Sequence, residues 1–182
     1  MIEYDPPVYR PPGEWRSFLV QATIGCSHNG CTFCGMYKGK KFRIRPMDDI
    51  IGDIREAAAF YNQYEKVFLC DGDAIVMKTE DLLEIIGEIK KDFPHCRLIS
   101  TYAGPRSTLS KTPEELKILH EAGLGRAYPG RKCWRRDCGS EMRASTCGAL
   151  SSSALAASLC LWKMPGRLRS SSTKCSPTTS PP

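Results

Sequence analysis

The segment GCSHNGCTFCGMY, from Gly25 to Tyr37, contains three of the ten cysteines of the 182-residue chain within nine residues. It directly follows SFLVQATI, from Ser17 to Ile24, an apolar run whose length and composition predict a buried strand. The cysteines are therefore expected on a loop at the C-terminal end of that strand. Sheets of α/β proteins place their chemistry at this end.

The three cysteines have the spacing Cys26-x4-Cys31-x2-Cys34, which is short enough for their thiols to reach one centre. A set of thiolate ligands selects an iron–sulfur cluster or zinc. A disulfide framework is disfavoured, because a trio leaves one thiol over and the N-terminal residues have no secretory features. The spacing therefore predicts a metal centre.

The identity of that centre stays open on spacing alone. Three thiolates are one ligand short of a closed zinc site, and His28 lies too close to its neighbours in the loop to complete one comfortably. A plant-type [2Fe–2S] site shares the C-x4-C-x2-C spacing and would take Cys70 as a distant fourth ligand. The third alternative is a four-iron cluster with three cysteine ligands and one open iron.

Two elements together resemble the radical S-adenosylmethionine (radical SAM) superfamily. The first is a strand followed by GCxxxxCxFC, with the aromatic Phe33 just before Cys34. It has one residue more between its first two cysteines than the usual C-x3-C-x2-C. The second is KVFLCDGDAIVM, residues 66–77, which resembles the second strand of these enzymes and their "GGE" element. The resemblance covers roughly residues 18–128.

The resemblance implies an enzyme with two cofactors, a [4Fe–4S] cluster and S-adenosylmethionine, and an external electron donor of the flavodoxin or ferredoxin type. The implied substrate is unidentified and would lose a hydrogen atom to a 5′-deoxyadenosyl radical. The implied metal ligands are Cys26, Cys31 and Cys34. The implied cofactor contacts are Phe33 at the adenine and Asp71, Gly72 and Asp73 at the ammonium group, with Tyr102 and Arg106 as further candidates. The alternative is a non-catalytic electron-transfer protein or a zinc-stabilised binding module.

The remainder of the core alternates strands with helices. Helices are predicted over residues 47–64, from Thr79 to before Pro94, and from a capping box at Thr112 to Gly123. Further strands are predicted over residues 67–70, 96–102 and 125–128. This alternation predicts an α/β fold with a parallel sheet, and by itself it also allows a flavodoxin-like sheet. The resemblance implies a partial radical SAM (β/α) TIM-like barrel of about three to four βα units.

The sequence divides into three regions. Residues 1–16 form a Pro-rich N-terminal arm, and residues 17–128 form the radical SAM core. Residues 129–182 contain 11 serines, five cysteines and only two acidic residues, a composition typical of disordered or non-native sequence. We hypothesise a truncation or a shifted reading frame after about residue 128. Finding no continuing βα pattern in the other two frames of the gene would refute this.

The formal charge of +6 does not predict a nucleic-acid partner, because it arises in the tail. The first 126 residues carry 17 Lys and Arg against 18 Asp and Glu. The basic run over residues 37–45 is interpreted as a solvated connector, with an anionic substrate or RNA as the alternative. No apolar run reaches membrane-spanning length and the N-terminus is unlike a signal peptide, so a cytoplasmic protein without a membrane anchor is expected.

Overall fold

The computed structural model of the chain describes residues 2–31 and 34–129, and its centre is a four-stranded sheet with the order β1-β4-β5-β6. All three strand pairs are parallel. The strands are β1 (Phe18–Gln21), β4 (Lys66–Cys70), β5 (Leu98–Ala103) and β6 (Leu124–Pro129). Each strand of this sheet therefore lies beside the strand of the same sheet that comes before it in the sequence.

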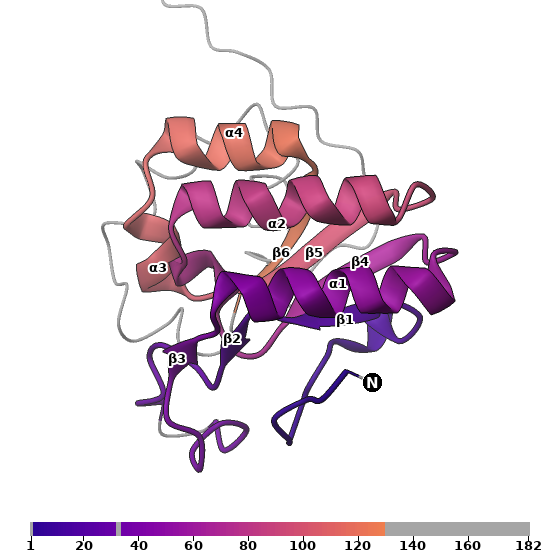
Figure 1. The fold of residues 1–182 in the computed structure, drawn as a ribbon. Helices are drawn as coiled ribbons and strands as arrows, with labels where there is room; N and C mark the ends of the chain where they lie inside the picture. The colour runs from indigo at the N-terminus through magenta and orange to yellow at the C-terminus, as the bar shows by residue number, and fades with distance from the viewer. Residues whose placement is uncertain (1, 32–33, 130–182) are drawn as a thin grey trace, which may run out of the picture.

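Three helices connect these strands and cover one face of the sheet (Figure 1). They are α1 (Met47–Tyr61), α2 (Thr79–Asp92) and α4 (Pro113–Ala122), and shorter elements are α3 (Pro105–Leu109), η1 (Pro12–Glu14) and η2 (Ala74–Val76). A flavodoxin-like sheet reverses its strand order and has helices on both faces. The observed order has no reversal, so the predicted α/β partial barrel is confirmed, with three βα units and a fourth strand.

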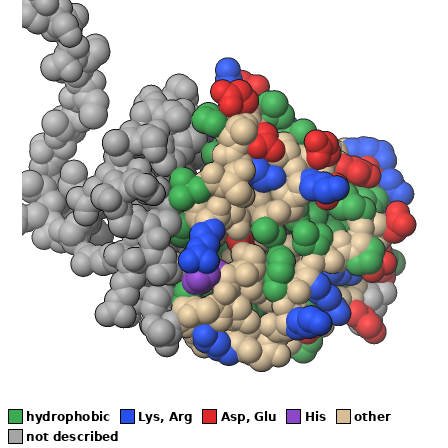
Figure 2. All heavy atoms as spheres, turned by 90° about the vertical axis from the view of Figure 1, so that its left-hand side faces the viewer, with side chains coloured by type: hydrophobic (Ala, Val, Ile, Leu, Met, Phe, Trp, Pro, Cys, Tyr) green, Lys and Arg blue, Asp and Glu red, His purple; other side chains and the backbone are tan. Residues whose placement is uncertain are grey.

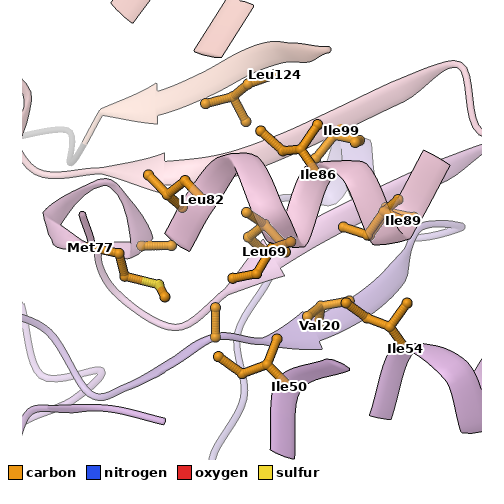
Figure 3. Close-up of a cluster of buried hydrophobic side chains, with 14 of the residues drawn as sticks. Val20, Ile50, Ile54, Leu69, Met77, Leu82, Ile86, Ile89, Ile99 and Leu124 are labelled. Atoms are coloured by element: carbon orange, nitrogen blue, oxygen red, sulfur yellow. The ribbon is translucent and has the colours of Figure 1, made fainter. Parts of the chain in front are cut away.

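The core lies between the sheet and this helical layer (Figure 3). Alternate residues of the strands point toward the helices, in agreement with the two-residue period of a strand. The helices contribute residues at intervals of three or four. Fully buried members of this cluster include Val20, Ile50, Ile54, Leu69, Leu82, Ile86, Ile89 and Ile99.

The predicted strand over residues 17–24 is wrong in its second half. β1 ends at Gln21, and the next residues form β2 (Thr23–Ile24), which leaves the sheet and pairs antiparallel with β3 (Arg43–Ile44). The run over residues 37–45 is thus not only a connector. The cause of the difference is a pairing between residues some 20 positions apart, which a local apolar period cannot reveal.

The predicted capping box of the last helix is confirmed. The Glu115 amide donates to Thr112 Oγ1 at 3.2 Å, and the Thr112 amide donates to Glu115 Oε2 at 2.8 Å. Gly123 ends the helix with a φ of 122°, which favours glycine. The short helix α3 was not predicted.

The tail interpreted as low-complexity sequence lies outside the described residues, apart from Pro129 at the end of β6. The hypothesis of a changed reading frame therefore stays a prediction. Within residues 2–31 and 34–129, no helix is both long enough and apolar enough to cross a membrane.

Candidate functional site

The loop between β2 and β3, residues 25–42, is called the cysteine loop here because it contains the three predicted ligands. It lies at the end of the sheet where the helices begin (Figure 1), and Figure 2 views this side, where acidic and basic side chains are interspersed. Cys26, Cys31 and Cys34 are half-buried, and none is in a disulfide. Phe33 lies outside the described residues. Over the described part of the chain, no three His, Cys, Asp or Glu side chains are arranged to hold a metal ion.

Asp71 joins the two ends of the cysteine loop. Its side chain is fully buried, and its Oδ2 accepts hydrogen bonds from the Gly25 amide at 2.7 Å and from Lys40 Nζ at 3.1 Å. Gly25 precedes the first cysteine and Lys40 follows the last one. The backbone of Asp71 has a φ of 64°, which is rare for a residue with a side chain. These contacts hold that conformation in place.

Gly72 lies against Cys26. Its amide donates to the Gly25 carbonyl at 2.8 Å. A Cβ added at residue 72 would lie 2.5 Å from Cys26 Cβ and 3.0 Å from Cys26 Sγ, and the first of these distances is shorter than atoms can approach. Only glycine therefore lets the chain after β4 pack directly on the first cysteine.

Asp73 connects the cysteine loop to the turn between β5 and α3. Its side chain is buried, and Oδ1 accepts from the Gly104 amide at 2.8 Å. Its Oδ2 accepts from the hydroxyls of Ser27 and Ser107, the latter at 2.5 Å. Within the described residues no Lys or Arg forms an ion pair with Asp73. The three residues Asp71, Gly72 and Asp73 thus all contact the cysteine loop.

The surroundings of Cys26 favour its thiol over its thiolate. Burial raises the pKa of Cys26, and the negative charges of Asp73 and Cys31 act in the same direction. Hydrogen bonds from the backbone of Asn29 and His28 oppose this rise in pKa only in part. A metal ligand must be deprotonated, so binding of a metal here would release a proton.

Cys70, the fourth ligand of the ferredoxin-type alternative, is fully buried at the end of β4. Burial raises the pKa of the Cys70 thiol strongly, and the adjacent Asp71 raises it further. Burial also raises the pKa of Asp71, although the Gly25 amide and Lys40 oppose this. These conditions favour the thiol form of Cys70, as burial also does at Cys26.

Three buried polar atoms in or beside the cysteine loop have no hydrogen-bond partner within the described residues: Thr23 Oγ1, Tyr37 Oη and Asp71 Oδ1. The last two belong to the predicted site region. Both side chains are almost fully buried, and the charge of Asp71 contributes to raising the pKa of Tyr37 after burial itself. Buried polar atoms are normally hydrogen-bonded. Each of these atoms is therefore a candidate contact for a bound polar group.

The two further candidates, Tyr102 and Arg106, differ in their exposure to solvent. Tyr102 is half-buried, and its ring packs edge-on against Phe68 with 5.1 Å between the ring centres. Burial, followed by the charges of Cys70, Tyr128 and Cys34, raises the pKa of Tyr102 to about 12. Arg106 is exposed on α3.

Sequence reasoning missed Lys40, Ser27 and Ser107. Lys40 belongs to a run of basic residues, and its partner Asp71 is 31 positions away. The hydroxyls meet Asp73 from positions 46 and 34 residues away in the chain. Isolated serines and a lysine among other lysines give no local signal of such contacts. The closeness of Cys26 to Asp71, Gly72 and Asp73 agrees with the predicted grouping.

Comparison with protein families finds that the model of the Radical SAM superfamily matches residues 20–146. The matched residues include the cysteine loop, β4, β5, β6 and β1 without its first two residues. They also include the first part of the tail, up to residue 146. Neither the curated proteins nor the solved structures gave a match.

Proposed function

Because the chain belongs to the radical SAM superfamily, we propose that it is a radical SAM enzyme that binds a [4Fe–4S] cluster through Cys26, Cys31 and Cys34. The observation that carries this proposal is the attachment of a three-cysteine loop to the Asp71–Asp73 segment at the C-terminal end of a parallel sheet. A cytoplasmic location, where thiols stay reduced, is part of the proposal.

The donor set fits a cluster. Three thiols that are not in disulfides lie on one loop, and soft thiolate ligands suit iron–sulfur clusters. Gly72 packs directly against Cys26 and so supports the backbone at this ligand. We propose that Cys31 and Cys34 move toward Cys26 when the cluster binds.

The acidic segment fits the cationic amine of S-adenosylmethionine. Asp71 Oδ1 lacks a donor among the described residues, and the buried Asp73 carboxylate accepts only from neutral groups there. Buried charges are normally paired, and Asp71 already forms an ion pair with Lys40 at 3.1 Å, so an ammonium group would supply the charge partner that Asp73 lacks and a donor for Asp71 Oδ1. Phe33 stays a predicted contact of the adenine.

When bound, the two cofactors supply the reductive cleavage of a sulfonium and a radical that removes hydrogen from the substrate. The chain's own contribution is to bind, orient and exclude water. Asp71 holds the ends of the loop, and Asp73 fixes Ser27 beside Cys26. The electron donor is proposed to be an external flavodoxin or ferredoxin, and the substrate is a small molecule or macromolecule not identified by these residues.

Anaerobic reconstitution with iron and sulfide, followed by iron counting and EPR, tests the proposal. We expect four irons per chain and a reduced-cluster EPR signal that changes when S-adenosylmethionine is added. Two irons per chain with a signal insensitive to S-adenosylmethionine would identify a [2Fe–2S] carrier instead. Protein that takes up no iron would contradict the proposal.

Cysteine variants identify the ligands. Cys26→Ala, Cys31→Ala and Cys34→Ala are each expected to lose the cluster. Cys70→Ala is expected to keep it, and loss of the cluster in this variant would support the ferredoxin-type alternative. Cys96→Ala is the matched control, because Cys96 is also not in a disulfide and its thiol donates weakly to the Leu98 carbonyl at 3.7 Å.

A further inference from the structure

Asp73 is held from two sides by hydroxyl groups that belong to different parts of the chain. Ser27 follows Cys26 in the cysteine loop, and Ser107 lies in α3 after β5. Both hydroxyls donate to the same carboxylate oxygen, Oδ2. This oxygen is therefore the point where the cysteine loop and α3 meet.

We infer that Ser27 and Ser107 are positioning residues of the cofactor site, which act through Asp73 to couple the cysteine loop to the β5–α3 turn. The inference rests on the proposed function for its role in cofactor binding. Neither serine is taken to touch a reacting atom. Both serines fix the orientation of the Asp73 carboxylate. Through that carboxylate, Ser107 also fixes the position of Ser27, the residue next to Cys26.

The space around the carboxylate leaves little freedom for another arrangement. A Cβ added at Gly104 would lie 2.5 Å from Asp73 Oδ2 and 3.0 Å from its Cγ. The Gly104 amide meanwhile donates to Oδ1 at 2.8 Å. Glycine at residue 104 thus allows the turn to close directly over the carboxylate, with each oxygen kept in its place.

The coupling is expected to be strong, because the acceptor is a buried carboxylate. Asp73 and Ser107 are only 1% and 6% exposed, so water does not readily replace the Ser107 hydroxyl, whereas Ser27 is half-buried. A hydrogen bond to a charged group is about twice as strong as one between neutral groups.

Hydrogen exchange on the metal-free chain tests the coupling without any cofactor. Ser107→Ala is expected to speed amide exchange about tenfold in peptides of residues 25–31, and Ser27→Ala in peptides of residues 104–110. Ser27→Thr keeps the hydroxyl and should restore the slower rates. Ser110→Ala is the control, because this exposed serine donates to the Ser107 carbonyl at 2.8 Å and not to Asp73. Effects confined to the mutated segment would overturn the inference.

Titration of the reconstituted protein tests the consequence for the cofactor. Ser27→Ala and Ser107→Ala are expected to bind the same amount of iron as the unaltered chain. Their apparent dissociation constant for S-adenosylmethionine, measured from the EPR change, should be about tenfold higher. Unchanged affinity in both variants, with iron bound, would overturn the inference and leave the proposed function standing. An unaltered chain that binds no iron would overturn the proposed function, and the inference with it.

Discussion

The two faces of the parallel sheet are stabilised by different interactions. The helix-covered face has apolar side chains, such as Val20, Leu69 and Ile99, packed against α1, α2 and α4 (Figure 3). The opposite face, called the inner face here, mixes polar and aromatic side chains. Its residues include Leu19, Gln21, Lys66, Phe68, Cys70, Leu98, Ser100, Tyr102, Arg126 and Tyr128. Burial of apolar groups needs no direction, whereas buried polar groups need specific partners, so the inner face depends on directed hydrogen bonds.

The N-terminal arm, of which the structure describes residues 2–16, supplies many of those partners. Glu14 in η1 is fully buried and accepts hydrogen bonds from Ser100 at 2.9 Å and from Tyr128 at 2.6 Å. At the other end of the arm, the Asp5 amide donates to Gln21 Oε1 at 2.9 Å. The arm is thus bound to three strands of the sheet by directed contacts. The comparison of the faces predicts that stability depends most on the helical side.

The largest expected effect is that of Leu69→Ala on the helix-covered face. Leu69 is fully buried in the central strand β4, and truncating such a leucine removes apolar burial and leaves a cavity. We expect the free energy of unfolding to fall by about 2–5 kcal/mol, measured by urea denaturation. Ile118→Ala is the control, because Ile118 is 47% exposed and should cost less than about 0.5 kcal/mol. Similar costs for both variants would contradict this account of the core.

Glu14→Gln tests the inner face and is expected to have an intermediate effect. The substitution keeps the shape of the side chain but removes its charge, which weakens the hydrogen bonds from Ser100 and Tyr128 and the ion pair with Arg126 at 3.4 Å. We expect a loss of about 1–3 kcal/mol near neutral pH in the same urea assay. A cost equal to that of Leu69→Ala would mean that the two faces contribute alike.

The effect of Glu14→Gln on the free energy of unfolding should also depend on pH. Burial alone raises the pKa of Glu14, but hydrogen bonds from Ser17, Tyr128 and Ser100 and the charge of Arg126 outweigh it and hold the pKa below its usual 4.5. A carboxyl whose pKa is lowered in the folded state stabilises the fold above the unfolded-state value, and this contribution is lost as pH falls through the folded-state pKa. The difference in unfolding free energy between unaltered protein and Glu14→Gln should therefore shrink in acid. A constant difference would contradict the assigned role of the charge.

The same contrast explains which parts of the structure the sequence could predict. The helix-covered face follows from apolar residues at regular intervals, and the capping box at Thr112 is contained within four residues. The cysteine spacing and the Asp71–Asp73 segment could also be singled out, because each is a short motif, and their role in a site stays a prediction. The inner face gave no such signal. Glu14 lies in a Pro-rich arm, and its partners Ser100 and Tyr128 are 86 and 114 positions away.

The candidate site, too, was predictable only where its residues belong to short motifs. Cys26 and Gly72 were identified from motifs, whereas Lys40 looked like one charge among several and Ser27 and Ser107 like ordinary loop residues. The end of β1 was misplaced for a related reason, because Thr23 pairs with Ile44 across the whole cysteine loop. Local patterns determine the elements here, and long-range polar contacts determine how the site is joined to them.

Tyr4→Phe is expected to have the smallest effect and tests how far the inner-face contacts extend along the arm. Tyr4 Oη donates to the Leu19 carbonyl at 2.8 Å, but the side chain is 36% exposed, so water can replace the lost hydroxyl. We expect a loss of no more than about 1 kcal/mol by urea denaturation. Tyr61→Phe, at a tyrosine that is 65% exposed at the end of α1, should cost still less. If Tyr4→Phe instead costs as much as Glu14→Gln, the outer end of the arm is attached as firmly as η1. The solvent exposure of a side chain would then not be what separates weak from strong hydrogen bonds on the inner face.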